Sequence, residues 1–143
     1  MEIRRDTYLQ QLISYRFDGL VKVITGIRRC GKSYLLKNIY KDYLLQNNVK
    51  IEQIITIELD LAKDIKYRNP LLLSSYVREI VERSNQEYYL FVDEIQMTDK
   101  VINPYSPNGK RITFYDALNN LRSLPNLDIY VTGSNSKMLS SDI

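Results

Sequence analysis

A glycine-rich loop between a strand-like and a helix-like segment constrains this chain most. Its sequence has the form G-x-x-x-x-G-K followed by Ser, running from Gly26 to Ser33. Residues 20–25 before the loop are rich in β-branched side chains, which favour a strand. Residues 33–46 after it carry apolar side chains at helical spacing. A chance match to the loop pattern alone has a frequency of roughly half a percent in a chain of this length. The pattern therefore predicts a strand–loop–helix unit.

The chemistry of such a loop is phosphate binding, and the pattern is that of a P-loop, or Walker A motif. Glycines let the backbone turn its N–H groups toward a phosphate chain, and the next helix points its N-terminal dipole at the anion. Lys32 is expected to reach the β- and γ-phosphates, and Ser33 to hold Mg²⁺. The alternative is an ordinary turn whose glycines serve only the turn. The predicted nucleotide-binding residues are Gly26, Ile27, Arg28, Arg29, Cys30, Gly31, Lys32, Ser33 and Tyr34.

A second motif follows a nearly continuous apolar run at residues 88–92, where Asp93 and Glu94 form a Walker B pattern. Such a run is typical of a strand covered on both faces. Asp93, at the strand's tip, is expected to hold a water on the Mg²⁺ ion, and Glu94 to polarise a water for attack on the γ-phosphate. The alternative for Glu94 is a solvated loop carboxylate. The stretch of sequence between the P-loop and this Walker B pattern leaves room for one intervening strand.

A third polar segment follows the apolar stretch 128–132. Ser134 or Asn135 is predicted to orient the attacking water beside the γ-phosphate, with Thr132 as third choice. Helix capping explains the same residue types equally well. Gln96 is expected to contact the nucleotide or a neighbouring element.

Strand-like and helix-like segments alternate along the whole chain. This alternation predicts an α/β fold, a three-layer sandwich with a mainly parallel sheet, whose strand ends meet on one side. The loop 98–111, which contains three Asn/Ser–Pro or Asn–Gly pairs, is predicted to be disordered or an extended hairpin, and its length also invites a functional role. The predicted strands are 20–25, 54–60, 88–92 and 128–132, and the predicted helices are 7–14, 33–46, one beginning at Pro70, one opened by a capping box at 113–116, and one at 137–139.

Composition excludes several classes of function. The chain has 143 residues, enough for about one domain, and its net charge of +3 is too small for an electrostatic nucleic-acid footprint. It has no histidine, which excludes Ser-His-Asp chemistry and His-ligated metal sites within these residues. A single cysteine, Cys30, excludes an internal disulfide and fits a reducing cytosol. No apolar run is long enough for a membrane span, and no secretory signal is visible, so a cytoplasmic location is expected.

Three segments taken in order, residues 26–33, 91–96 and 130–136, resemble the AAA-superfamily ATPases of bacteria and archaea. The resemblance extends over nearly the whole chain and implies an ASCE-type P-loop core that binds ATP with Mg²⁺. Members of that group are longer, with a C-terminal part that resembles a restriction nuclease. Residues 1–143 are accordingly expected to be the N-terminal ATPase domain of a longer protein, cut before the fifth strand, any arginine finger and the helical lid. Exposed apolar surface at the free sheet edge is expected as a result, and a homo-oligomer or a DNA or protein partner through the C-terminal part is left open.

The leading functional hypothesis is an ATPase core whose nucleotide state drives a conformational change elsewhere, with slow turnover because an arginine finger is absent. A regulatory switch or DNA-associated module that binds ATP and hardly hydrolyses it is the alternative. A P-loop kinase is a weaker one, since a water-activating Glu94 has no use in a kinase. A GTPase is disfavoured because the chain contains no Asn-Lys-x-Asp sequence to read guanine.

Overall fold

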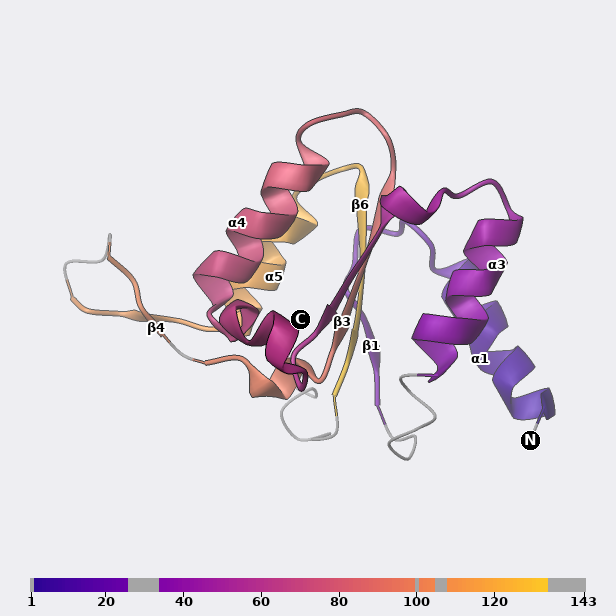
Figure 1. Cartoon of the computed structure of the whole chain (residues 1–143), viewed down its shortest axis with the longest axis horizontal. Coiled ribbons are helices and arrows are strands. Elements are labelled where there is room, and N and C mark those ends of the chain that lie inside the picture. The colour runs from indigo at the N-terminus through magenta and orange to yellow at the C-terminus, as the bar shows by residue number, and fades with distance from the viewer. Residues whose placement is uncertain (1, 26–33, 100, 105–107, 134–143) are drawn as a thin grey trace.

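A computed structural model of the chain describes residues 2–25, 34–99, 101–104 and 108–133. Its centre is a four-stranded, all-parallel sheet with strand order β1-β6-β3-β2 (Figure 1). The strands are β1 (Lys22–Ile24), β2 (Ile54–Glu58), β3 (Tyr88–Asp93) and β6 (Leu127–Thr132). Helices cover both faces, so the predicted α/β class with a parallel sheet is confirmed.

One face of the sheet packs on two helices, α4 (Pro70–Val81) and α5 (Phe114–Arg122) (Figure 1). Alternate residues of β2, β3 and β6 point into this core because side chains alternate between the faces of a strand. From α4, Leu73, Val77 and Val81 are almost completely buried at helical spacing. In this layer, every second residue of the strands packs against the apolar side chains that recur once per turn on the helix.

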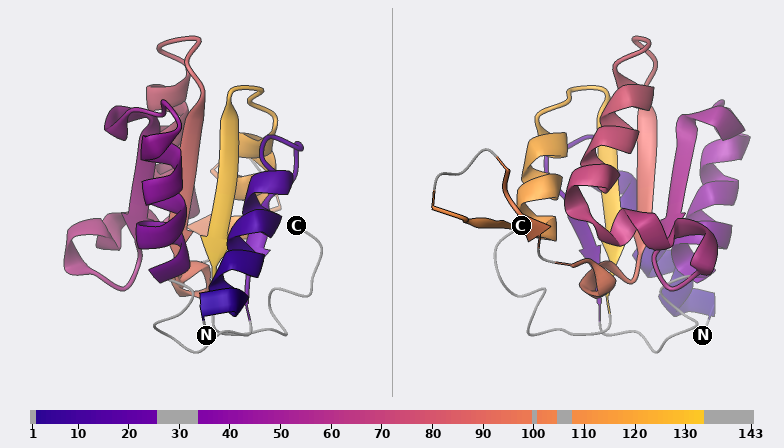
Figure 2. Two further views of the ribbon diagram at one scale, coloured as in Figure 1. Left: turned by 90° about the vertical axis from the view of Figure 1, so that its right-hand side faces the viewer. Right: turned by 60° about the vertical axis from the view of Figure 1, so that its left-hand side comes forward.

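The opposite face packs on α1 (Glu2–Ser14), η1 (Leu35–Tyr40) and α3 (Lys41–Gln46) (Figure 2). The sheet contributes aromatic side chains here, Tyr89, Phe91 and Tyr130, each no more than 1% exposed. Tyr40 from η1 lies among them, with ring centroids 4.9 Å from Tyr130 and 5.9 Å from Phe91. These tyrosines are packing residues of the core, whereas Tyr15, Tyr34 and Tyr76 are exposed.

The parallel arrangement brings the last residues of all four strands to one edge of the sheet. Ile24 is paired in register with Thr132, and Glu58 with Asp93, while Val92 is paired with Val131. One strand, β2, lies between the two motifs in the sequence, as their spacing predicted, whereas in the sheet it is β6 that lies between β1 and β3. Thr25, Glu94 and Gly133, which directly follow β1, β3 and β6, therefore lie at the same edge of the sheet.

Several local predictions are confirmed by hydrogen bonds. The Asn69 side chain accepts from the backbone N–H groups of Leu71 and Leu72, and Pro70 is the first residue of α4. The backbone N–H of Thr113 donates to Asp116 at 2.9 Å, closing the capping box of α5. Asn48 follows α3 with a φ of 71°, the left-handed conformation in which asparagine ends helices.

Other boundaries differ from the prediction. The first helix begins at Glu2 rather than at residue 7, because the polar turn 2–6 continues the helix without an apolar stripe to mark it. β1 and β2 are shorter than the predicted strands 20–25 and 54–60. Three short 3₁₀ turns were not predicted: η2 (Ile51–Gln53), η3 (Ala62–Arg68) and η4 (Ile95–Met97). The predicted helix 137–139 lies outside the described residues.

The long loop at 98–111 contains an antiparallel hairpin, one of its two predicted alternatives. β4 (Val101–Ile102) pairs with β5 (Arg111–Ile112), and the hairpin projects beyond the helices α4 and α5 (Figure 1). The predicted helix 33–46 is also divided, since η1 is π-helical and only α3 is regular α-helix. Among the described residues, no helix has both the length and the apolar character that a membrane span requires.

Candidate nucleotide site

The predicted site residues fall into two groups. Residues 26–33, which include Lys32 and Ser33, and the pair Ser134 and Asn135 lie outside the described residues. Tyr34, Asp93, Glu94, Gln96 and Thr132 are described. Tyr34 begins the helical segment after the glycine-rich loop and is 44% exposed. The other four gather at the carboxyl edge of the sheet, where β3 and β6 end.

Asp93 is the last residue of β3 and is only 6% exposed. Its Oδ1 accepts a hydrogen bond of 2.5 Å from the Thr132 hydroxyl, and its Oδ2 lies 3.3 Å from Lys37 Nζ. The Asp93 backbone carbonyl accepts from the N–H of Leu59 at 3.2 Å. This side chain is thus fixed by groups from β6 and η1, and a buried carboxylate of this kind requires such partners.

Glu94 follows directly, in the left-handed conformation with φ 60° and ψ 54°. Its backbone N–H donates to the Thr132 hydroxyl at 3.1 Å, and its Oε1 accepts from Gln96 Nε2 at 2.5 Å. A non-glycine residue in this region of φ and ψ stores about 1–3 kcal/mol of strain, which the surrounding structure must hold in place. The two adjacent carboxylates have different partners: Glu94 pairs with Gln96, and Asp93 with Thr132 and Lys37.

The carboxyl ends of β1 and β6 are joined by a backbone hydrogen bond. The backbone N–H of Gly133 donates to the Ile24 carbonyl at 3.3 Å. Thr132 is completely buried beside this bond. Thr25 is the last described residue before the glycine-rich loop. It directly follows Ile24, whose carbonyl accepts this bond from the residue after Thr132.

Sequence reasoning missed two members of this cluster, Lys37 and Glu58. Lys37 is on η1, and its ammonium lies 2.6 Å from Glu58 Oε2 as well as 3.3 Å from Asp93 Oδ2. Glu58 ends β2, and Lys63 Nζ lies 3.5 Å from its second oxygen, Oε1. A signal was present, since Lys37 stands one helical turn after Ser33 and Glu58 ends a strand, but neither belongs to a motif.

Electrostatics keep the Lys37 ammonium charged. Partial burial acts to lower the pKa of Lys37, but the hydrogen bond to Glu58 and the charge of Asp93 outweigh it. The net effect is a pKa above the usual value for lysine. A permanent cation therefore lies between the carboxylates at the ends of β2 and β3.

The donors at this edge suit a magnesium ion held together with phosphate oxygens. Mg²⁺ prefers oxygen ligands and is usually bound through one or two carboxylates plus substrate phosphates rather than by an all-protein cage. Asp93 and Thr132 supply oxygens at one point, already facing a positive charge. The part of the chain that the structure describes has no group of three or more His, Cys, Asp or Glu residues arranged to hold a metal. The residues present fit a metal that arrives with a nucleotide.

A cavity of about 380 Å³ lies between α1 and the edge strand β1. Apolar side chains such as Leu12, Val21 and Leu35 contribute to its lining. It reaches Thr25 and Leu35, which lie on either side of residues 26–34 in the sequence. Leu20, near the start of β1, is 54% exposed, whereas Val21 and Ile24 are buried.

A parallel sheet with an acidic pair at the tip of one strand and a glycine-rich loop after another defines a P-loop nucleotide-binding fold. A family model described as an AAA domain matches residues 18–143. The chain therefore belongs to the AAA domain family, whose members are in general P-loop ATPases.

Two curated relatives are similar over most of the chain, and both are described only as uncharacterized. One, from Haemophilus influenzae, is 32% identical over 144 residues, which is 99% of this chain and 32% of the relative. The other, MJ1544 of Methanocaldococcus jannaschii, is 31% identical over 130 residues, covering 86% of this chain and 23% of the relative. The chain thus spans about a third of the length of the first relative and about a quarter of the second.

Proposed function

We propose that this chain binds ATP with Mg²⁺ and hydrolyses it, and that its nucleotide state drives a conformational change elsewhere in the protein. The strand order is the observation that carries the proposal. Because β6 lies between β1 and β3, the Asp93–Glu94 pair ends at the same edge at which the glycine-rich loop leaves β1. A phosphate chain held by the loop would then lie next to the carboxylates.

In this proposal the nucleotide phosphates are held by residues 26–34, with Lys32 neutralising the β- and γ-phosphates. Ser33 and Asp93 hold Mg²⁺, which when bound neutralises the charge that develops on the phosphate oxygens. The fixed position of Asp93, with hydrogen bonds on one oxygen and an ion pair on the other, supports its assignment.

Glu94 is assigned as the residue that orients and polarises the attacking water. Its left-handed backbone and its hydrogen bond to Gln96 support this role, because strained residues cluster at active sites. Ser134 or Asn135 is proposed to orient the same water from the end of β6. The conformational output would begin at Thr132, which contacts both acidic residues and ends the same strand.

The cavity between α1 and β1 is proposed as the place for the adenine base. It reaches the residues on either side of the phosphate loop, and an apolar lining suits a purine. A homo-oligomer, or a DNA or protein partner bound through further domains, would receive the conformational change. A cytoplasmic location is part of the same proposal.

Calorimetric titration of Mg-ATP into the native chain and into Lys32→Ala tests binding. We expect saturable one-site binding to the native chain and at least a tenfold loss in the variant, because Lys32 is the residue proposed to neutralise the β- and γ-phosphates. Lys63→Ala is the matched control, since that lysine is 59% exposed on η3 and should leave affinity unchanged. Equal binding by the native chain and Lys32→Ala would remove the loop from the proposal.

Turnover is tested separately with Glu94→Gln. We expect this variant to keep ATP affinity and to lose most phosphate release, by about 100-fold or more for a general base. Phosphate release that is unaffected would remove Glu94 from the mechanism. Adding GTP in place of ATP should weaken binding, and equal affinity would argue against adenine selectivity.

A further inference from the structure

Lys37 bridges two carboxylates that are direct neighbours in the sheet. Glu58 and Asp93 are Cα partners in the β2–β3 register, and each is the last residue of its strand. Two like charges side by side at strand ends repel each other. The Lys37 ammonium lies between them, 2.6 Å from Glu58 Oε2 and 3.3 Å from Asp93 Oδ2.

The two contacts differ in length, and the two carboxylates differ in burial and in their other partners. Asp93 Oδ1 is held by the fully buried Thr132, so Lys37 takes only the other oxygen, Oδ2. Glu58 is 20% exposed in its side chain and has a second cation, Lys63, near Oε1. The shorter bond is the one to Glu58, so the lysine can leave Asp93 without losing its closest partner.

We propose that Lys37 is a positioning residue that occupies Asp93 Oδ2 until Mg²⁺ arrives and then pairs with Glu58 alone. The inference rests on the proposed function, since it concerns the metal that accompanies ATP. Lys37 and Mg²⁺ compete for one carboxylate oxygen, and Glu58 sets the outcome by holding the displaced ammonium. The device discourages metal binding at Asp93 when no nucleotide phosphates are present to complete the coordination.

A general effect of charge on metal binding predicts some of the same shifts, so the test must separate this effect from the proposed exchange of partners by Lys37. Removing a cation near a metal site favours metal binding, and removing an anion disfavours it, whatever the local geometry. These effects would add in a double variant. If Glu58 acts by holding Lys37, its substitution loses most of its effect once Lys37 is gone.

The experiment is a Mg²⁺ titration of the native chain and of K37M, E58Q and K37M/E58Q at a fixed concentration of a fluorescent ATP analogue. Bound nucleotide is the readout, with no turnover required. For K37M we expect the Mg²⁺ midpoint to fall about fivefold, and for E58Q to rise by about the same factor. When E58Q is added to K37M, the further shift of the Mg²⁺ midpoint should be less than about half of the shift that E58Q causes in the native chain.

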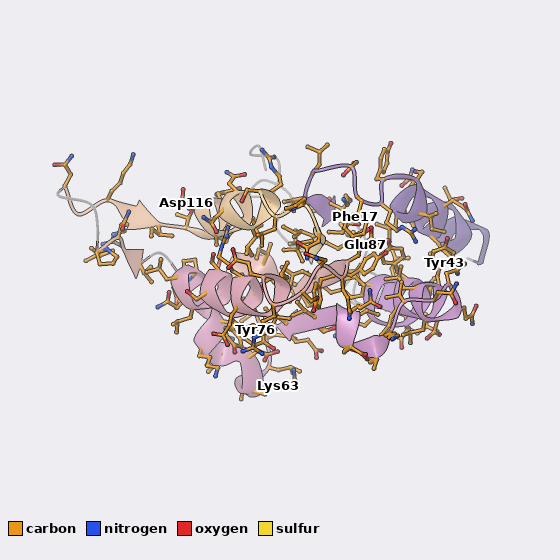
Figure 3. All side chains as sticks on the ribbon, turned by 90° about the horizontal axis from the view of Figure 1, so that it is seen from above. Phe17, Tyr43, Lys63, Tyr76, Glu87 and Asp116 are labelled. Atoms are coloured by element: carbon orange, nitrogen blue, oxygen red, sulfur yellow. The ribbon has the colours of Figure 1, made fainter. Side chains whose placement is uncertain are left out.

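K63M is the matched control, because it removes the same charge beside Glu58, at a lysine whose ion-pair partners are Glu58 and Asp64. Lys63 is labelled in Figure 3 and lies on η3. The Mg²⁺ midpoint of K63M should differ from that of the native chain by less than twofold. Thermal unfolding without Mg²⁺ checks that each variant is folded, and E58Q, which keeps Lys37 in place, tests the inference even if K37M does not fold.

The outcomes divide cleanly. Additive shifts in the double variant, or a shift in K63M as large as in K37M, would overturn the inference and leave the proposed function intact. An E58Q midpoint equal to or below that of the native chain would do the same. A native chain that binds no nucleotide at any Mg²⁺ concentration would overturn the proposed function, and the inference with it.

Discussion

The Thr132 hydroxyl donates to Asp93 Oδ1 at 2.5 Å, joining the tips of two neighbouring strands through a side chain with no solvent exposure. The Thr132 hydroxyl oxygen also accepts a hydrogen bond from the backbone N–H of Glu94 at 3.1 Å. One hydroxyl thus fixes the direction of the Asp93 carboxylate and the start of the left-handed turn at Glu94. The hydroxyl therefore acts both as a donor and as an acceptor.

Replacing Thr132 with valine should damage both stability and turnover. Valine has the same shape but leaves Asp93 Oδ1 and the Glu94 N–H without this partner, which costs about 1–3 kcal/mol for a buried group. Denaturant unfolding gives the free-energy change, and phosphate release gives the rate. Thr132→Ser, which keeps the hydroxyl, is the control and should retain most of the activity. A loss in Thr132→Ser with little change in Thr132→Val would show that the methyl group and not the hydroxyl matters.

Glycine at position 94 should separate strain from chemistry. The left-handed conformation costs a non-glycine residue about 1–2 kcal/mol, and glycine loses about 0.5–1 kcal/mol through the entropy of the unfolded chain. Glu94→Gly is therefore expected to change the free energy of unfolding by less than about 1 kcal/mol while abolishing hydrolysis. Chemical denaturation with Glu94→Gln as the comparison provides the measurement. A loss of several kcal/mol in Glu94→Gly would mean that the carboxylate is chiefly structural.

The order and type of the main elements could be predicted because their signals are local. Asn69 and Pro70 mark a helix start, and the uninterrupted apolar run of β3 marks a strand covered on both faces. The helix boundary at Glu2 could not be predicted, because polar residues 2–6 carry no periodic signal. η3 lies between β2 and α4 without an apolar stripe, and its 3₁₀ geometry depends on tertiary bonds such as Arg68 Nε to the Leu59 carbonyl at 2.9 Å.

The candidate site was predictable only where a motif carries the chemistry. Asp93 and Glu94 follow an apolar strand, and that pattern is readable in one dimension. Lys37 and Glu58 are 21 residues apart and meet only because β2 is placed beside β3 by the sheet register. Thr132 was ranked below its neighbours because a hydroxyl on a strand tip has no sequence signature that distinguishes it from a helix cap.

A buried ion pair lies at the opposite end of the sheet. Lys22 Nζ is 2.5 Å from Asp128 Oδ1, with the two side chains 8% and 2% exposed. Asp128 Oδ2 also accepts from the backbone N–H of Phe17 at 3.0 Å and from the Tyr130 hydroxyl at 2.5 Å. The pair thus connects β1, β6 and the turn after α1, far from the carboxyl edge.

Breaking this pair on one side should be strongly destabilising. Lys22→Met leaves the Asp128 charge buried beside a methyl group, and the expected cost is about 3–5 kcal/mol in the free energy of unfolding. Lys22→Met/Asp128→Asn removes both charges and should recover part of that loss. Urea denaturation measures both. Arg83→Met, at an ion pair whose side chains are each 69% exposed, is the control and should cost less than about 1 kcal/mol. A double variant as unstable as Lys22→Met would contradict the electrostatic explanation.

Alkaline pH should destabilise the protein through its buried tyrosines. Burial raises the pKa of Tyr89 from 10.0 to about 12, and burial likewise raises the pKa of Tyr40 and Tyr130. A tyrosine whose pKa is higher in the folded state keeps its proton there while the unfolded chain releases it. The contribution of this tyrosine to the free energy of unfolding is therefore complete below pH 10, its pKa in the unfolded chain. It is lost as the pH rises through its pKa in the folded protein.

Tyr89→Phe tests this linkage. Phenylalanine cannot ionise, so the variant should lose less stability than the native chain between pH 10 and pH 12, although the charging of Tyr40 and Tyr130 still destabilises it. Lys37, whose pKa is also raised, acts in the same direction above pH 10.5 and is common to both proteins. Thermal unfolding followed across this pH range measures the difference, with Tyr15→Phe at a 56% exposed position as control. Parallel curves for the native chain and Tyr89→Phe would show that Tyr89 does not resist ionisation in the folded protein.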